Sequence, residues 1–409
     1  MKKLLMLIVL ILLTGCGQTE QVVSLSAYDH KKVYLASEME FLTAEESPIK
    51  LERTAMPDFG TYSIKCVTAD TYSPQAPELE FHQQTTGNIF CYTVYKEIAY
   101  FVVSFDDYHE FSHIVKLFAY DLNSGSVKVI YTFEADSSSI YVSDIYVNDT
   151  DICFIELKDG DADIYYVENI HTDTNTSETA YKTDKSIMFF QDSAVPSWYE
   201  LSDHNALIKY CDNSKITNGV EYYGFRRSLP YESSKLSYGM SMNSSECVSI
   251  NINENNKALR IDTDYKFLDL RYASEDSTLW LEWKAENDYS EPCLYCYDFD
   301  NDMLYNFPIS RMGVFFSDCC IDGKYFLHLV RDNIFGKNND FIENVYYIDM
   351  KNRKAYNLTE NTVGKNDSLV RVEYEYLHSK NNCLYFYSRY NSNEESAEYK
   401  YQYLYRCEV

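Results

Sequence analysis

Hydrophobic and polar residues alternate along the stretch from Leu117 to Phe133, LFAYDLNSGSVKVIYTF, and weaker copies of this pattern recur to the end of the chain. In a strand, Leu117, Ala119 and Asp121 would point to one side and the residues between them to the other. An Asn-Ser-Gly segment that ends at Gly125 interrupts the alternation, and glycine suits the positive φ of a short hairpin loop. Aromatic and β-branched residues fill both arms. The stretch therefore predicts a β-hairpin.

Copies of this unit include STLWLEW with PCLYCYDF, KYFLHLV with NVYYIDM, and CLYFYSRY with YQYLYRCEV. An alignment on the ends of the third strands places five residues in equivalent positions, namely Asp121, Glu168, Asp298, Asp349 and Arg406. Four short strands in roughly every 40 to 60 residues are typical of a β-propeller. We therefore predict an all-β fold, a β-propeller of seven or eight four-stranded blades. The alternative is a pair of tandem β-sandwiches, which would show a linker near the middle of the chain.

The last strand-like segment, YQYLYRC, runs almost to the final residue. A propeller needs its first and last blades to meet, since each thin sheet is covered only by its neighbours. We therefore expect this segment to pair with residues 25–45 and close the ring. On this interpretation the propeller domain covers residues 25–409.

The N-terminus has the pattern of a signal peptide. Lys2 and Lys3 precede an apolar run, Leu4 to Leu13, that is too short to span a bilayer as a helix. The run ends in Leu13-Thr14-Gly15-Cys16, which resembles the lipobox of bacterial lipoproteins at all four positions. The resemblance implies cleavage before Cys16 and attachment of a diacylglyceryl group to its thiol. No later segment is long and apolar enough to span a membrane.

This resemblance implies three parts: a signal peptide over residues 1–15, a lipidated tether over residues 16–24, and an extracytoplasmic domain held at the cell membrane through the lipid on Cys16. The whole pattern is similar to the irregular propellers of bacterial extracytoplasmic lipoproteins. That similarity is architectural, because no WD or kelch signature is present.

Charge and composition narrow the choice of partners. The formal net charge is -27, which repels phosphate backbones and disfavours nucleic acid as a partner. The same charge disfavours broad adhesion to anionic headgroups. The 40 tyrosines reflect either a strand-forming composition or a set of ring platforms for sugars or peptides.

Eleven of the twelve cysteines remain if Cys16 carries a lipid, and most of them lie in apolar strand-like runs. This favours reduced thiols in the core. Cys293 and Cys296 have CxxC spacing, but residues three apart on a strand face opposite sides. Cys319 and Cys320 are adjacent and equally unsuited to sharing a metal, so we expect no zinc ribbon.

One short motif has the form of a metal site. His109-Glu110-Phe111-Ser112-His113 resembles the zincin signature H-E-x-x-H, in which the two histidines bind zinc and the glutamate activates water. The motif needs a helix, but it lies between the strand-like segments EIAYFVVSF and IVKLFAYDL. In an extended segment, residues four apart are about 13 Å apart, too far for one metal. His109, Glu110 and His113 are therefore metal candidates only if this segment is helical.

Three further groups of charged residues could either bind a ligand or lie in a plain surface turn. The acids in Lys158-Asp159-Gly160-Asp161-Ala162-Asp163 could suit calcium, but the full EF-hand spacing is missing. Asp298, Asp300 and Asp302 form a similar group. Arg226-Arg227 could grip a carboxylate or phosphate.

The sequence contains no G-x-S-x-G elbow, P-loop or Rossmann fingerprint, and it predicts no cofactor. We expect a non-catalytic binding or scaffold module for a glycan, peptide or envelope protein, with the ligand at one end of the propeller channel. The alternative is an envelope hydrolase acting on glycan or peptide. Convergent carboxylates or a metal in the channel would favour the hydrolase.

Overall fold

The structure is a computed structural model. The described residues are 19–24, 33–34, 39–68, 79–85, 87–105, 114–133, 140–158, 164–174, 176–189, 196–201, 205–212, 215–223, 236–239, 247–252, 257–262, 267–273, 277–283, 293–298, 303–309, 312–321, 323–332, 343–359, 371–380, 382–391 and 399–409. In the strands within 19–34, 62–85 and 205–283 it describes the backbone alone.

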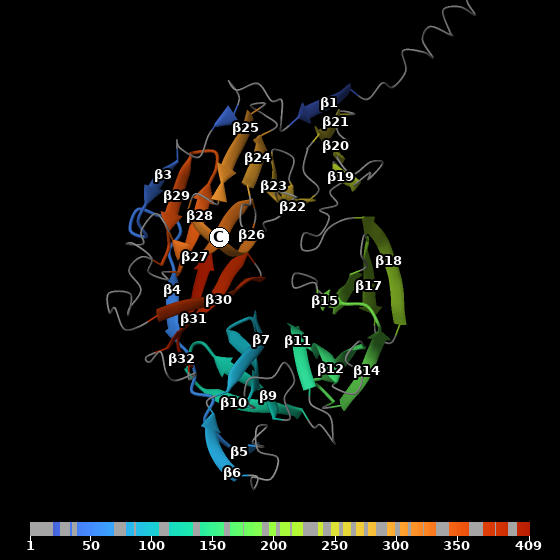
Figure 1. Cartoon of the computed structure of the whole chain (residues 1–409). Helices are drawn as coiled ribbons and strands as arrows, with labels where there is room; N and C mark the ends of the chain where they lie inside the picture. The colour runs from blue at the N-terminus through green and yellow to red at the C-terminus, as the bar shows by residue number, and fades with distance from the viewer. Residues whose placement is uncertain are drawn as a thin grey trace, which may run out of the picture.

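The described strands form seven sheets of four or five strands and one separate hairpin. Figure 1 shows the seven sheets, called blades 1 to 7, following one another around a ring in chain order. The fold is an all-β propeller, as the repeats predict, and the tandem-sandwich alternative is not what the chain adopts. Blade 1 contains β7(Asn88–Tyr95), β8(Ile98–Ser104), β9(Val115–Asp121) and β10(Val127–Phe133). Blade 2 contains β11(Ile140–Val147), β12(Asp151–Lys158), β13(Tyr165–His171) and β14(Thr176–Thr183). Blade 3 contains β15(Ile187–Phe189), β16(Ser197–Leu201), β17(Asn205–Asp212) and β18(Lys215–Tyr223).

The other four blades each include one strand from the N-terminal part of the chain. Blade 4 contains β19(Leu236–Gly239), β20(Cys247–Ile252), β21(Lys257–Asp262) and β1(Thr19–Ser24). Blade 5 contains β22(Phe267–Ala273), β23(Ser277–Trp283), β24(Cys293–Asp298), β25(Met303–Pro308) and β2(Val33–Tyr34). Blade 6 contains β26(Gly313–Ile321), β27(Lys324–Asp332), β28(Glu343–Asp349), β29(Lys354–Asn357) and β3(Glu40–Leu42). Blade 7 contains β30(Arg371–Lys380), β31(Cys383–Asn391), β32(Tyr399–Glu408) and β4(Glu52–Ala55), and the separate hairpin is β5(Tyr62–Thr68) with β6(Leu79–Thr85).

The hairpin predicted from Leu117 to Phe133 is confirmed as β9 and β10. Its turn is built by Asp121, whose carboxylate accepts hydrogen bonds from the backbone N–H groups of Asn123 and Ser124 at 2.9 and 2.8 Å. Gly125 takes a φ of +71°, which a side chain would disfavour. The hydrogen bond from the Ser124 backbone and the weaker one from Asn123 lower the pKa of Asp121 despite some desolvation. Asp349 builds the β28–β29 turn in the same way, accepting from the Asn352 backbone at 3.0 Å.

Short and long connections are separated on the two ends of the ring. In most blades, short turns join the first strand to the second and the third strand to the fourth, such as Lys96–Glu97 in blade 1. We call the side of the ring that carries these turns the turn end. The second and third strands of blades 1, 2, 5, 6 and 7 are joined by longer connections at the opposite side, the loop end. Ion pairs between turns of neighbouring blades, Lys96 with Asp149 and Lys351 with Asp298, put these turns on the same side.

The N-terminal chain passes along the outer edges of blades 4 to 7. Strands β1, β2 and β3 add parallel to the last strands of blades 4, 5 and 6, while β4 pairs antiparallel with β32 as the fourth strand of blade 7. Thr19–Ser24, placed in the predicted tether, therefore form β1. The final segment does pair with N-terminal chain, but at Glu52–Ala55 rather than within residues 25–45. The reason is that three earlier N-terminal strands already occupy the edges of other blades.

The core is divided among the interfaces between blades. One cluster joins blades 7 and 1 through Tyr385 and Leu404 on one side and Tyr92 and Phe101 on the other. Comparable clusters lie between blades 1 and 2, 2 and 3, 5 and 6, and 6 and 7. Each large apolar side chain buried there stabilises the fold by about 1.5–3 kcal/mol. A blade is therefore stable only with its neighbours in place.

Candidate functional site

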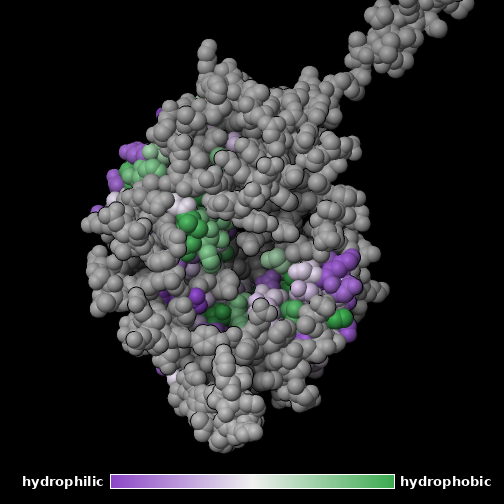
Figure 2. All heavy atoms as spheres, viewed as in Figure 1, coloured by the Kyte–Doolittle hydropathy of each residue, from purple (hydrophilic) through white to green (hydrophobic). Residues whose placement is uncertain are grey.

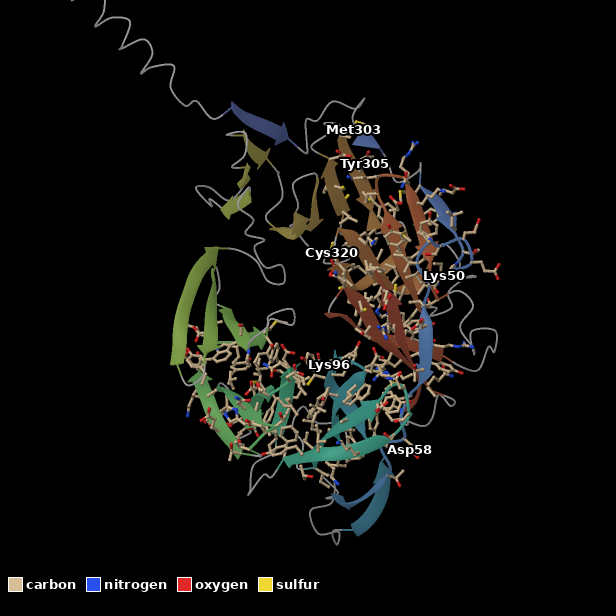
Figure 3. All side chains as sticks on the ribbon, turned by 180° about the vertical axis from the view of Figure 1, so that it is seen from behind. Lys50, Asp58, Lys96, Met303, Tyr305 and Cys320 are labelled. Carbon is tan, nitrogen blue, oxygen red and sulfur yellow. The ribbon has the colours of Figure 1, made fainter. Side chains whose placement is uncertain are left out.

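The first strands of the blades surround a hollow at the centre of the ring. Figure 2 shows this hollow, with hydrophobic side chains along part of its wall. Strand β26 of blade 6 lines the hollow, because it is the first strand of its sheet and contacts the first strands β22 and β30 of both neighbouring blades. In Figure 3 Cys320 of β26 lies on the side of blade 6 that faces the centre of the ring. This inner wall is the candidate functional site.

Three first strands carry a β-bulge at the same depth in the ring. The extra residues are Phe90 in β7, Ser143 in β11 and Phe316 in β26. Each bulge lies opposite the fifth and sixth residues of the following strand, which are Val102–Val103, Ile155–Glu156 and His328–Leu329. A bulge leaves one residue outside the ladder and redirects its side chain. The ring of bulges therefore turns side chains of blades 1, 2 and 6 away from their sheets at one level.

Blade 6 exposes apolar side chains at this level. Phe316 is 50% exposed and Val314 is 41% exposed. Phe316 lies in the middle of an innermost strand, far from both ends, so solvent reaches its ring from the hollow. The other two bulges expose less, because Phe90 packs against Tyr141 with ring centroids 5.0 Å apart and the Ser143 hydroxyl is buried. Val314 and Phe316 thus form an apolar patch on one side of the inner wall.

A chain of polar groups lies directly behind this patch. The ring of Phe316 stands edge-on over His328, with centroids 4.9 Å apart. His328 is 0% exposed, and its Nε2 lies 3.0 Å from Oε2 of Glu343, which is 4% exposed. Its Nδ1 lies 3.4 Å from Oγ of Ser317. The same Glu343 oxygen accepts a hydrogen bond from the backbone N–H of Tyr374 at 3.0 Å, so this chain also links blade 6 to blade 7.

The hydrogen-bond directions along this row of polar groups follow from its partners. Oε2 of Glu343 already accepts from the Tyr374 backbone N–H, so it can also accept from His328 Nε2–H. The imidazole Nδ1 is then an acceptor, and the Ser317 hydroxyl can donate to it. Hydroxyl, imidazole and carboxylate in this order have the polarity of a nucleophile, its base and the group that orients the base. The arrangement can serve either as an interblade link or as an activated serine.

A second histidine cluster lies at the turn end of blade 2. Nδ1 of His171 is 2.9 Å from Oδ1 of Asp151, and Nε2 is 3.3 Å from Oε1 of Glu178. Desolvation alone would lower the pKa of His171, but the hydrogen bonds that its ring N–H groups donate to the carboxylates of Glu178 and Asp151 outweigh it and raise that pKa. Because the pKa is raised by folding, the stabilisation is complete below the unfolded value near 6.5 and is lost as the pH rises through the folded value.

We therefore expect His171→Asn to lower the melting temperature more at pH 5.5 than at pH 8.5. Thermal unfolding at the two pH values, compared with that of the native chain, measures the difference. Glu178→Gln should reduce the same pH dependence, since it removes one of the two carboxylates. An equal loss for His171→Asn at both pH values would contradict the assignment.

The metal candidates of the sequence fall outside the described residues. His109, Glu110 and His113, like Cys16, are not among them. The chain on either side of the H-E-x-x-H segment is described, and the Phe105 N–H donates to the Ile114 carbonyl at 2.9 Å. The motif thus lies within the ten-residue connection, residues 105–114, between the antiparallel strands β8 and β9.

The other predicted clusters are only partly described. Asp159, Asp161, Asp163 and the Arg226-Arg227 pair lie outside the described residues, as do Asp300 and Asp302. Asp298 is buried and pairs with Lys351 at 3.6 Å, which is an interblade contact. Within the described part of the chain, no group of three or more His, Cys, Asp or Glu side chains could hold a metal ion. Among those same residues, no helix is long and apolar enough to cross a membrane.

No disulfide joins the eight cysteines whose side chains are described. Burial raises the pKa of Cys91 well above its usual value, with a smaller contribution from Asp144. Burial and then the neighbouring Cys383 raise the pKa of Cys407 to about 12. These thiols remain protonated at neutral pH and are poor nucleophiles. Both therefore agree with the expectation of reduced core thiols.

The inner-wall residues Val314 and Phe316 carry no sequence signal of their exposure. Val314 and Phe316 lie in an apolar run whose exposure depends on a bulge, and no local signal marks that bulge. His328 did carry a signal, since it interrupts the apolar segment KYFLHLV and a buried imidazole needs partners. Its partner Glu343 lies on another strand and could not be identified without the pairing.

Comparison with known proteins gives neighbours in fold only. No protein family model and no curated protein matches the chain. The β-propeller domain of the Trilobed protease from Pyrococcus furiosus is similar over 78% of this chain and 93% of its own, with 11% identity and a TM-score of 0.47. An acylaminoacyl peptidase from Pyrococcus horikoshii matches 75% of this chain and 57% of its own, with 10% identity and a TM-score of 0.37. An oligogalacturonate lyase in complex with manganese matches 88% and 97%, with 10% identity and a TM-score of 0.34.

These similarities are low in both identity and score. They carry no argument about this chain, whose propeller architecture is read from its own sheets. Its function must be argued from the inner wall and from the N-terminal segment.

Proposed function

We propose that this protein is a lipid-anchored extracytoplasmic β-propeller that binds an apolar segment of a partner polypeptide in its central hollow. The observation that carries the binding proposal is the half-exposed Phe316 beside Val314 in the middle of an innermost strand. Concave sites lined by apolar and aromatic side chains are the usual places of ligand binding. The anchoring proposal is supported by the resemblance of residues 13–16 to a lipobox.

The chemistry of the patch favours a polypeptide over a glycan. An aliphatic side chain beside an aromatic ring offers contact to leucine-like or aromatic side chains, whereas a sugar needs polar partners for its hydroxyls. The net charge of -27 disfavours acidic ligands. The ligand is therefore a neutral or basic segment with at least one large apolar side chain.

This proposal predicts which exposed apolar residues matter for binding. Dodecapeptides selected from a phage-displayed random library on the purified domain should be rich in large apolar residues and poor in acids. For a selected peptide, Phe316→Ala should weaken binding about tenfold to a hundredfold, because a buried Phe contributes roughly 1.5–3 kcal/mol. Fluorescence anisotropy of the labelled peptide measures the affinity.

A matched pair of valines controls for exposure. Val314→Ala should weaken the same peptide, while Val129→Ala should not, although Val129 is 46% exposed on the outer strand β10. Equal effects of the two valine variants would contradict binding in the hollow. Binding that depends on Phe316 but appears only on a glycan array would keep the site and replace the ligand class.

A second candidate function rests on the polar chain behind the patch. Ser317, His328 and Glu343 have the order of a hydrolase nucleophile, base and orienting acid, and Ser317 is half-buried on the wall of the hollow. In that reaction Ser317 Oγ would attack an acyl carbonyl, its proton would pass to His328 Nδ1 and then to the leaving group, and water would hydrolyse the acyl-enzyme.

A fluorophosphonate probe separates the two candidates. An activated Ser317 would be labelled, the label would be found on its tryptic peptide by mass spectrometry, and Ser317→Ala would abolish it. Ser143→Ala, a serine at the equivalent depth in blade 2, should leave the labelling unchanged. A native domain that takes no label at Ser317 removes the hydrolase candidate and leaves the binding proposal standing.

A further inference from the structure

The direction of β1 fixes where the N-terminal anchor leaves the propeller. Strand β1 runs parallel to β21, with Thr19 opposite Lys257 and Ser24 opposite Asp262. The end of the ring at which β21 terminates is therefore also the end at which β1 terminates. Thr19 lies at the opposite end.

The strand that follows β21 shows which end this is. Strand β22 runs parallel to β24, because both pair antiparallel with β23. Strand β24 ends at Asp298, whose carboxylate pairs with Lys351 in the β28–β29 turn, and this places the end of β24 at the turn end. It follows that β22 also ends at the turn end and begins at the loop end.

The connection from β21 to β22 is short. Four residues separate Asp262 from Phe267 and can span at most about 18 Å. If Asp262 lay at the turn end, these four residues would have to run back along the length of a six-residue strand, about 20 Å, to reach Phe267 at the loop end. They would also have to cross from the outer part of blade 4 to the inner strand of blade 5, and the two distances together exceed their reach. Asp262 therefore lies at the loop end, and Thr19 lies at the turn end.

The other N-terminal strands agree with this direction. Strands β2 and β3 are parallel to the last strands of blades 5 and 6, and β4 is antiparallel to β32. All of them run from the turn end to the loop end. Thr19 is only three positions after Cys16, a distance of at most about 11 Å along the chain.

We propose that the lipid on Cys16 holds the propeller with its turn end toward the membrane and its loop end away from it. This orientation rests on the proposed lipid anchoring, and its partner surface is the bilayer itself. The long connections between second and third strands then begin and end on the side that faces an external partner.

Energy transfer from two serine positions to the bilayer tests this orientation. Ser124 lies in the β9–β10 turn at the turn end, and Ser186 lies between β14 and β15 at the loop end, and both are exposed. Each is replaced in turn by p-azidophenylalanine in the full-length lipidated protein and coupled to the same donor dye. The protein is reconstituted in vesicles of phosphatidylcholine and phosphatidylglycerol that carry a headgroup-labelled acceptor. The positions differ in height by about 25 Å, the length of a strand of seven or eight residues.

The expected result is a higher transfer efficiency from position 124 than from position 186. A spacer of twenty Gly and Ser residues inserted between Cys16 and Thr19 should remove this difference while the protein still floats with the vesicles. Equal efficiencies without the spacer, or a higher value at position 186, would overturn the orientation alone. Flotation that fails in the native lipoprotein, or that persists when residues 1–16 are omitted so that both the apolar signal segment and the lipid are missing, would instead overturn the lipid anchoring on which the orientation rests.

Discussion

Phe59→Ala should cost about 3–5 kcal/mol of unfolding free energy, because the residue closes the ring. Phe59 follows β4, is 6% exposed, and belongs to the cluster between blades 7 and 1. Its ring centroid lies 5.3 Å from that of Phe101 and 5.1 Å from that of Phe118 in blade 1, and 6.0 Å from that of Tyr401 in blade 7. Alanine would leave a cavity bounded by three aromatic rings from two blades.

The measurement is urea unfolding followed by tryptophan fluorescence and by far-UV circular dichroism. Phe316→Ala is the matched control, since it removes the same side chain from the half-exposed inner wall, and it should cost only about 1 kcal/mol, because half of that side chain is already exposed. Separate transitions for the two probes in Phe59→Ala would show that opening this interface uncouples the blades. A Phe59 variant as stable as the Phe316 variant would mean that the N-terminal segment does not close the ring.

The ring closure also shows where sequence reasoning succeeds and where it stops. The hairpin at Leu117 to Phe133 was predictable because its turn chemistry is local. The alignment on third strands placed Asp121, Asp298 and Asp349 correctly, since each is the last residue of its strand. It placed Glu168 and Arg406 less well, since they lie three and two residues before the ends of theirs. The partner of the final strand was misplaced because β2 and β3 contain two and three residues, too few to show alternation.

The inner wall was harder to predict for a different physical reason. A bulge inserts one residue and changes which face the following residues occupy, so strict alternation in VFFSD cannot identify Phe316 as exposed. The His328–Glu343 contact needs the register of β27 and β28, in which Leu329 pairs with Asn344. That register is set by pairing across a ten-residue connection, residues 333–342, and not by local sequence.

Glu343→Ala should also destabilise the domain by about 3–5 kcal/mol, since removing one partner of a buried pair leaves the other without compensation. Its carboxylate oxygen serves both His328 Nε2 and the Tyr374 backbone N–H, each at 3.0 Å. The variant would therefore leave a buried imidazole and a buried backbone donor without this acceptor. Urea unfolding at constant pH gives the change, and an unchanged m value would show that the unfolding transition itself is preserved.

Two further variants separate burial from mere ion pairing. Glu178→Ala breaks a His–Glu contact of similar kind, but Glu178 is largely exposed, so the loss should stay within about 0–1 kcal/mol. The double variant His328→Leu with Glu343→Leu should be more stable than Glu343→Ala, because both buried polar partners are replaced by apolar groups. The Tyr374 N–H and the half-buried Ser317 hydroxyl then lose this acceptor and this imidazole, but no buried imidazole is left without its partner. If Glu343→Ala cost no more than Glu178→Ala, the link between blades 6 and 7 would have to come from their apolar cluster alone. The chain from Ser317 through His328 to Glu343 would then be too loosely held to orient a nucleophile.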